Sequence, residues 1–382
     1  MKQKKYLFLA LASVALMACS NDEVISRNTD GSTGNDVILF GAGVGMDVVT
    51  RAATDVQSTA FAAGEKVDVF MSEHVTSGSA TTTYPQPLIY TTTSTQCTDN
   101  STTTPSVVDY YKFTDSASDG INTVTPMWPT SGNGIDIYAY YPSGAVTASN
   151  APGVTFTVKD DQSADAVTSS VLNYKLSDLM YAKKENQARV TTRVPLLFTH
   201  LLSKVTITLK GDQSLNTDHA GWAPGASVSD QEAAQTAANA KLANATISLK
   251  NIQKIVTFDA KDEKTETALG SGIYKFGSVS GTAGDIVVED VPATISAATD
   301  LQGSAIFPPQ TLLATTDFIE IQLSAAQGSG KLVYKIPTGG MTFESGKNYS
   351  FAITVKLTGL SVSASITDWD SVVGDSNGEA TM

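Results

Sequence analysis

The stretch VILFGAGVGMDVVTRAA occupies residues 37–53 and alternates in side-chain character. Its even-numbered positions carry apolar side chains, namely Ile38, Phe40, Ala42, Val44, Met46 and Val48. Glycine occupies several of the positions between them. Because successive side chains of a strand point to opposite faces, this spacing predicts a β-strand whose apolar face packs into a core. A lone arginine, Arg51, follows the strand.

Short runs of the same kind recur along the chain between turn-forming residues. They lie at residues 66–71, 134–141, 153–158, 202–210, 245–250, 284–288, 318–323, 331–336 and 348–357. Runs of this length, rich in β-branched and aromatic residues, are typical of strands in an all-β protein. The exception is the alanine-rich segment 229–243. It opens with the capping candidates Ser229 and Asp230, so we expect a helix inserted between strands.

The chain of 382 residues is long enough for two β-domains. One series of strands ends just before residue 200, and another begins just after it. We therefore predict an N-terminal β-sandwich at residues 52–200 and a C-terminal β-sandwich at residues 201–382.

The first residues have the features of an export signal. Lysines at positions 2, 4 and 5 precede an apolar segment at residues 6–17, which is short for a membrane span. The sequence LMAC at residues 16–19 resembles a bacterial lipobox. It implies a signal peptide at residues 1–18 and a lipid, diacylglycerol with palmitate, on Cys19. An ordinary signal peptide with a chance cysteine is the alternative. With Cys19 lipidated, Cys97 has no partner for a disulfide.

The overall charge argues against two classes of protein. The formal net charge is −13, and no basic cluster occurs beyond the first residues, so the chain is not expected to bind nucleic acid. Only 16% of the residues are charged, and β-branched residues are plentiful, which is unlike a long disordered acidic chain. These features favour a folded protein.

No arrangement of residues predicts an active site. The three histidines His74, His200 and His219 are far apart and lack metal-ligand spacing, and His200 is expected to be a structural residue near the core. The glycine-rich segment 41–45 lacks the dinucleotide-binding pattern, and GSGK at residues 328–331 is interpreted as a hairpin turn. No GxSxG motif occurs, and the acidic pairs are interpreted as solvated turn residues. We therefore expect neither an enzyme nor a cofactor or metal site.

Five ordered blocks resemble conserved segments of the fimbrillin family, the type V pilins. They are WP at 128–129 with IDIYAYYP at 135–142, DLMYA at 178–182 with VPLLFTHLLSKV at 194–205, IFPPQTL at 306–312, GKNYSF at 346–351, and ITDW at 366–369. The resemblance implies two tandem transthyretin-like Greek-key β-sandwich domains. Packing alone also explains the aromatic residues in these blocks. On either interpretation, Trp128, Tyr138, Tyr140, Phe198 and Trp369 are expected to be buried.

The resemblance also implies a maturation step. Such pilins reach the outer membrane as lipid-anchored precursors, and an arginine-specific surface protease removes the first strand. Arg51 matches the cleavage position, which makes residues 19–51 a propeptide that contains the first strand. Arg27 is the competing site, but cleavage there leaves the strand in place. Loss of the strand is expected to open a groove that a strand of a neighbouring subunit fills.

The C-terminal end contains the candidate donor strand. Its alternating apolar residues are Leu360, Val362, Ala364 and Ile366, followed by Trp369. We expect bends at 367–368 and 374–375 that let this tail swing outward. The alternative is that the tail is the last strand of its own C-terminal sandwich.

These features predict a structural fimbrial (pilus) subunit that supports cell adhesion and polymerises with other fimbrial subunits. The competing hypothesis is a monomeric surface lipoprotein, or tip adhesin, that binds glycan or a host protein. Its candidate binding face is the segment around Trp222 together with residues 75–106. The latter are rich in Thr and Ser and are expected to form a loop around a short strand near Leu88.

Overall fold

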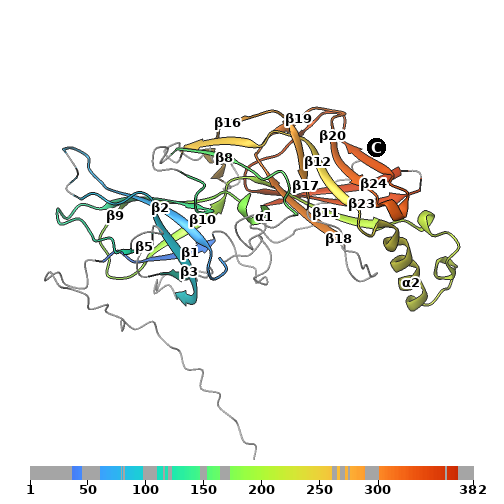
Figure 1. Cartoon of the computed structure of the whole chain (residues 1–382), viewed down its shortest axis with the longest axis horizontal. Coiled ribbons are helices and arrows are strands. Elements are labelled where there is room, and N and C mark those ends of the chain that lie inside the picture. The colour runs from blue at the N-terminus through green and yellow to red at the C-terminus, as the bar shows by residue number, and fades with distance from the viewer. Residues whose placement is uncertain are drawn as a thin grey trace, which may run out of the picture.

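The computed structural model describes residues 37–44, 61–78, 80, 82–97, 110–114, 117–118, 123–146, 153–163, 173–259, 265–266, 272–273, 276–288, 301–357 and 359–368. Strands make up most of the regular structure, and the N-terminal and C-terminal strands gather at opposite ends of the molecule (Figure 1). The predicted all-β class is confirmed. Within the described ranges, no helix has the length and apolar character needed to cross a membrane.

The N-terminal strands are joined by hydrogen bonds into a closed barrel. Its order is β1 (Phe40–Val44), β10 (Val194–His200), β9 (Met180–Gln187), β7 (Ile135–Tyr141), β2 (Lys66–Glu73), β3 (Leu88–Cys97) and β4 (Tyr110–Phe113). β1 closes this barrel because it pairs in parallel with β10 and antiparallel with β4. A continuous ring thus replaces the two separate sheets expected of a sandwich. The Greek-key arrangement of two domains stays a prediction.

The C-terminal strands form two four-stranded sheets. One has the order β18 (Leu301–Phe307), β11 (Ser203–Gly211), β23 (Lys347–Lys356) and β24 (Gly359–Asp368). The other has the order β17 (Gly284–Val287), β12 (Thr246–Ile252), β20 (Asp317–Gln322) and β21 (Lys331–Lys335). Buried residues of both sheets belong to one apolar core. β24 stands at the end of the strand order of the first sheet and is therefore an edge strand.

A third sheet connects the two halves of the chain. It consists of β16 (Phe276–Ser280), β13 (Ile255–Asp259) and β8 (Gly153–Thr157). β8 precedes the predicted boundary at residue 200, yet it pairs with β13 from the far side of that boundary. The rings of Tyr181 and Phe258 also meet across it, with centroids 5.1 Å apart. The boundary stays a prediction, and the segment around β8 packs with the C-terminal core.

Short elements complete the described chain. They are the strands β5 (Ala117–Ser118), β6 (Thr123–Val124), β14 (Thr265–Glu266), β15 (Gly272–Ile273), β19 (Thr311–Leu312) and β22 (Met341–Thr342), the helix α1 (Asn173–Leu176), and 3-10 turns at Gln213–Leu215, Ala220–Trp222, Ala240–Leu242 and Ala325–Gln327. Each predicted strand run contains a strand. The short strand expected near Leu88 is wrong in length. β3 continues to Cys97, because its threonines are β-branched and suit an extended backbone.

The predicted helix is confirmed as α2 (Val228–Asn239), inserted between β11 and β12. Its cap is Ser227, two residues before the expected Ser229, and the Ser227 hydroxyl accepts a hydrogen bond from the Asp230 N–H. The preceding turn lies so close to α2 that a Cβ at Gly221 would stand 1.9 Å from the Asp230 carbonyl oxygen. Trp222 is half-buried in this turn, and its indole N–H donates to the Asn216 carbonyl oxygen at 2.8 Å. The Trp222 segment is thus a packed turn, which disfavours it as an open binding face.

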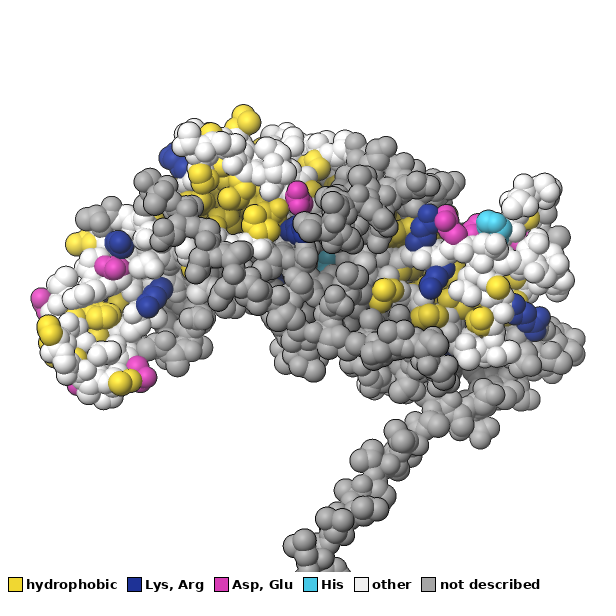
Figure 2. Space-filling model, turned by 180° about the vertical axis from the view of Figure 1, so that it is seen from behind, with side chains coloured by type: hydrophobic (Ala, Val, Ile, Leu, Met, Phe, Trp, Pro, Cys, Tyr) yellow, Lys and Arg dark blue, Asp and Glu magenta, His cyan; other side chains and the backbone are white. Residues whose placement is uncertain are grey.

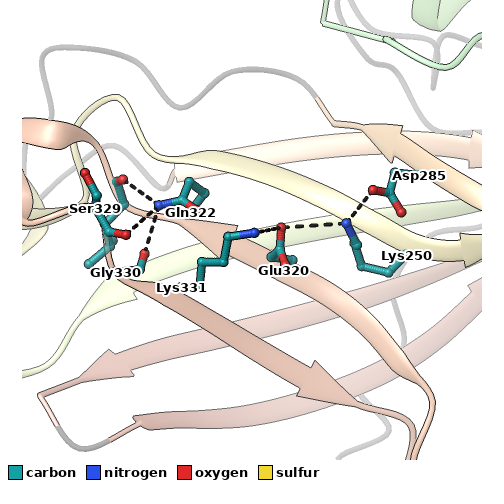
Figure 3. A network of polar contacts seen from close by, with 8 residues as sticks. Lys250, Asp285, Glu320, Gln322, Ser329, Gly330 and Lys331 are labelled. Carbon is teal, nitrogen blue, oxygen red and sulfur yellow. Dashed lines mark hydrogen bonds and ion pairs between the residues drawn. The ribbon is translucent and has the colours of Figure 1, made fainter.

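Charges line the outer surface of the sheet that contains β12 and β20 (Figure 3). The Lys250 ammonium binds Asp285 on one side and Glu320 on the other, with 3.7 Å between Lys250 Nζ and Glu320 Oε1. The hydrogen bond to Asp285 is the main cause that raises the pKa of Lys250. Lys331 Nζ lies 3.3 Å from Glu320. This face therefore carries a solvated row of side chains whose charges alternate in sign.

The hairpin turn expected at residues 328–331 joins β20 to β21. The Gln322 amide donates to the carbonyl oxygens of Ser329 and Gly330 at the end of this turn (Figure 3). Gly328 adopts a φ of 92°, a conformation that favours glycine. The interpretation of GSGK as a turn is confirmed.

Seen from behind the view of Figure 1, charged side chains lie singly or in small groups among polar and apolar ones (Figure 2). In the part of that view that the structure describes, Lys and Arg do not gather into one continuous basic surface. Apolar side chains are most concentrated over the upper part of the C-terminal half.

Candidate functional site

The first strand occupies a fully enclosed position in the N-terminal barrel. Ile38, Phe40 and Ala42 each have 0% exposure and belong to the N-terminal core. Val44 ends β1, whereas Met46 and Val48 lie outside the described residues. For Ile38, Phe40 and Ala42, the apolar alternation of the sequence thus corresponds to side chains that point into the barrel.

The backbone of β1 is held on both sides. In the parallel ladder with β10, Phe40 lies opposite Val194 and Val44 opposite Phe198. On the other side Ala42 lies opposite Tyr111 of β4. The Val194 N–H donates to the Leu39 carbonyl oxygen at 2.7 Å. Successive amides of a strand alternate in direction. The missing N–H of the next residue, a proline, therefore falls on the side away from β1 and does not interrupt this ladder.

Aromatic side chains pack around the place of Phe40. The Phe40 ring meets the Tyr90 ring edge-on at 5.2 Å, and Tyr90 stacks on Phe113 at 5.6 Å. The Tyr90 hydroxyl is buried and has no hydrogen-bond partner among the described residues. Burial raises the pKa of this hydroxyl. Phe40 therefore contributes a large share of the packing at one end of the barrel interior.

Arg193 joins β1 to β4 where their ladder ends. The paired residues of β1 and β4 are Gly41 with Lys112 and Ala42 with Tyr111, so Phe40 and Phe113 would be the next pair. Instead, Arg193 Nη1 donates to both of their carbonyl oxygens, at 3.0 Å to Phe40 and 3.3 Å to Phe113. Because these two hydrogen bonds are with backbone oxygens, Arg193 can bind any strand that occupies the position of β1, whatever its side chains.

We expect Arg193→Met to lower the free energy of unfolding of the N-terminal barrel by roughly 1.5–3 kcal/mol, the usual contribution of hydrogen bonds from a charged donor. Amide hydrogen exchange in β1 and β4 measures the effect. Arg193→Lys keeps the charge and is expected to recover part of the loss. Equal exchange rates in the parent and Arg193→Met proteins would contradict this role.

The candidate donor residues lie in β24, which pairs antiparallel with β23 along its whole length. Leu360 and Val362 are buried, Ala364 is half-buried, and Ile366 is 53% exposed. The expected bend at residues 367–368 is wrong, because both residues lie within the strand. Trp369 lies outside the described residues. Among the described residues β24 is thus the last strand of its own C-terminal sheet, which agrees with the alternative interpretation.

Three predicted processing residues, Cys19, Arg27 and Arg51, also lie outside the described residues. Lipidation at Cys19 and cleavage after Arg51 or Arg27 therefore stay predictions. The strand that cleavage after Arg51 would remove is described, and its position in the barrel does not depend on these residues.

The histidines occupy separate structural positions. His200 Nδ1 lies 2.8 Å from Asp178 Oδ1, and both side chains are almost fully buried, which confirms the expected structural role of His200. His74 Nδ1 lies 2.9 Å from Asp136 Oδ1 in a more exposed pair, and His219 caps the Ala220–Trp222 turn. The described part of the chain contains no group of three or more His, Cys, Asp or Glu side chains that could hold a metal ion.

The aromatic residues of the fimbrillin-like blocks are predicted to be buried, and this is confirmed for three of the four that the structure describes. Trp128, Tyr140 and Phe198 are buried. Tyr138 is half-buried, with Lys183 Nζ 5.9 Å from its ring centroid. These residues contribute to the two apolar cores.

The sequence and the fold of this chain are similar to those of known proteins. A model of the fimbrillin-like family matches residues 50–369. The chain belongs to this family. The "Putative fimbrium subunit Fim1C" of Bacteroides uniformis is 26% identical to this fimbrillin-like chain over 381 residues, covering 99% of this chain and 98% of that protein.

Two solved structures share the fold of this fimbrillin-like protein, and both are described as "putative cell adhesion protein". One, from Bacteroides uniformis, has a TM-score of 0.53 and 21% identity, and the match covers 90% of this chain and 100% of that chain. The other, from Bacteroides ovatus, has a TM-score of 0.51 and 16% identity, with 89% and 99% covered. At this level of identity the likeness supports the fold of the fimbrillin-like chain.

Proposed function

We propose that this fimbrillin-like chain is a structural subunit of a fimbrium, and that cleavage after Arg51 triggers its assembly by strand exchange. The observation that carries the proposal is the position of β1, which closes the N-terminal barrel and pairs with a strand on each side. Family membership and the fimbrium relative support a role in a fimbrium.

Removal of β1 is costly for an isolated subunit. Each large apolar side chain that leaves the core forfeits about 1.5–3 kcal/mol of burial, and Ile38 and Phe40 are both fully enclosed. The facing backbone groups of β10 and β4 lose their partners, which adds to the cost. A trimmed subunit therefore has an open slot that favours the entry of another strand.

The edge strand β24 of a second copy can fill this slot. In its own subunit, β24 pairs on one side with β23, and its Ile366 side chain is half-exposed. In the slot it would pair on both sides and face positions with 0% exposure. Exchange thus gives the strand a second ladder and covers the apolar side chains that line the vacated slot, which gives a driving force for assembly.

The geometry of this contact favours a filament. The tail of one copy enters the N-terminal barrel of the next, so the two surfaces differ and the contact is head-to-tail. Cleavage after Arg51 also separates the folded chain from Cys19. We propose that the lipid holds the precursor at the outer membrane and that the trimmed subunit leaves it for the surface fimbrium.

The test is cleavage of purified precursor by an arginine-specific protease, followed by electrophoresis without heating. We expect a ladder of stable oligomers from the parent protein and from Arg27→Ala, and monomer from Arg51→Ala. The intact mass of the trimmed product identifies the cut. Oligomers of equal yield from Arg51→Ala, or a trimmed parent that stays monomeric, would contradict the proposal. The latter result would favour the monomeric surface lipoprotein.

A further inference from the structure

β1 and β24 share a pattern of side-chain size. Along β1 the inward positions are Ile38, Phe40 and Ala42, so two large side chains precede a small one. Along β24 the corresponding residues are Leu360, Val362 and Ala364. The position after each alanine is again branched, Val44 in one strand and Ile366 in the other. The outward positions between them are also small, glycine at 41 and 43 and serine at 363 and 365.

We propose that β24 of a second copy enters the slot in one orientation and one register, running as β1 runs, with Ala364 in the place of Ala42. This inference rests on the strand exchange proposed above and specifies how the strand is seated. It makes the entering strand parallel to β10 and antiparallel to β4. Ala364 is then the residue that decides the register.

The place of Ala42 is fully enclosed. Ala42 has 0% exposure and lies between Leu196 of β10 and Tyr111 of β4. A shift of two residues would bring Val362 or Ile366 to this place, and extra methyl groups in a packed core force neighbouring side chains from their preferred rotamers.

A reversed strand fits poorly in the two registers that bring Ala364 or Val362 to the place of Ala42. With Ala364 at Ala42, the reversed strand brings Asp368 to the place of Ile38, where exposure is 0%. A carboxylate there is buried without solvent, which is strongly unfavourable. With Val362 at Ala42, the reversed strand brings Ala364 to the place of Phe40 and leaves a larger void beside Tyr90 than Val362 leaves in the proposed register.

Arg193 suits this exchange because its two hydrogen bonds are with backbone carbonyl oxygens and do not depend on the side chains of the strand. In the proposed register the carbonyl oxygen of Val362 takes the place of the Phe40 oxygen, which accepts from Arg193 at 3.0 Å. The same guanidinium therefore serves both strands. The pattern of side-chain size supplies the register, and Arg193 holds the backbone.

Cross-linking between cysteines tests the register. Gly41 lies opposite Lys112 of β4, and Lys112 is on the outward side of its strand because the neighbouring Phe113 points into the core. In the proposed register Ser363 takes the place of Gly41. We would combine Lys112→Cys with each of Ser361→Cys, Ser363→Cys and Ser365→Cys, all in a Cys97→Ser background. Full-length protein is then trimmed with the arginine-specific protease under mild oxidation.

We expect the Ser363→Cys protein to form the intermolecular disulfide in highest yield. A displacement of two residues moves a side chain by about 6.6 Å, beyond disulfide reach. The uncut proteins, in which β1 still fills the slot, are the control and are expected to form none. Oligomers that cross-link best through position 361 or 365, or through no position, would overturn the register and leave the exchange standing. Absence of oligomers from all trimmed proteins would overturn the exchange itself.

A pair of matched substitutions gives a second readout. Ala364→Leu and Ser363→Leu place the same side chain on opposite faces of β24. We expect Ala364→Leu to slow oligomer formation by trimmed protein about tenfold, because the added carbons enter the enclosed place of Ala42, opposite Leu196. Ser363→Leu points outward and is expected to assemble at close to the parent rate. Equal rates for the two variants would overturn the inference.

Discussion

The Phe40→Ala precursor is expected to lose about 3–5 kcal/mol of stability in its N-terminal barrel, as is usual when a buried aromatic side chain is truncated. The ring is fully buried, and its edge-on contact with Tyr90 is lost together with its burial. Amide hydrogen exchange in β10 is the measurement. A loss of this size corresponds to exchange about a hundredfold faster or more.

Two controls accompany this prediction. Leu39→Ala truncates a half-buried neighbour on the opposite face of the strand and is expected to cost about 1 kcal/mol. After cleavage at Arg51, residue 40 is no longer part of the chain, so trimmed Phe40→Ala and trimmed parent protein are expected to behave identically. A difference that survives trimming would show that the strand had remained in place.

Asp178→Ala is expected to be the next most damaging substitution, with a loss of about 3–5 kcal/mol. Asp178 and His200 lie side by side where β9 and β10 meet the C-terminal half, and their side chains are 2% and 1% exposed. Removal of the carboxylate leaves a buried imidazole without its acceptor. Thermal unfolding of the full-length protein measures the effect.

The pair formed by His74 and Asp136 provides the matched control. Its Nδ1 to Oδ1 distance is 2.9 Å, but its side chains are 30% and 21% exposed, so water can replace the lost contact. Asp136→Ala is therefore expected to cost less than about 1 kcal/mol. Equal losses from the two substitutions would show that burial does not decide the strength of these pairs.

Local pattern predicted much of this fold. The strand runs, the helix near residue 230 and the hairpin at residues 328–331 were all visible as period-two or capping signals, and each is confirmed. The length of β3 was underestimated because its run of Thr and Ser looked like a low-complexity loop. The role of Arg193 had no sequence signal, because a guanidinium that binds backbone oxygens 153 and 80 residues away leaves no spacing to recognise.

The amino-acid sequence by itself determined the all-β class and the side chains that β1 and β24 direct inward, since alternation depends only on neighbouring residues. It also carried the resemblance to fimbrillins. Only the tertiary structure decided that β1 lies between β10 and β4 and closes the barrel, and that β24 sits at the edge of its own sheet. Strand partners are chosen by contacts between segments far apart in the chain. The alternation of apolar and polar residues that predicts a strand does not specify which strands lie beside it.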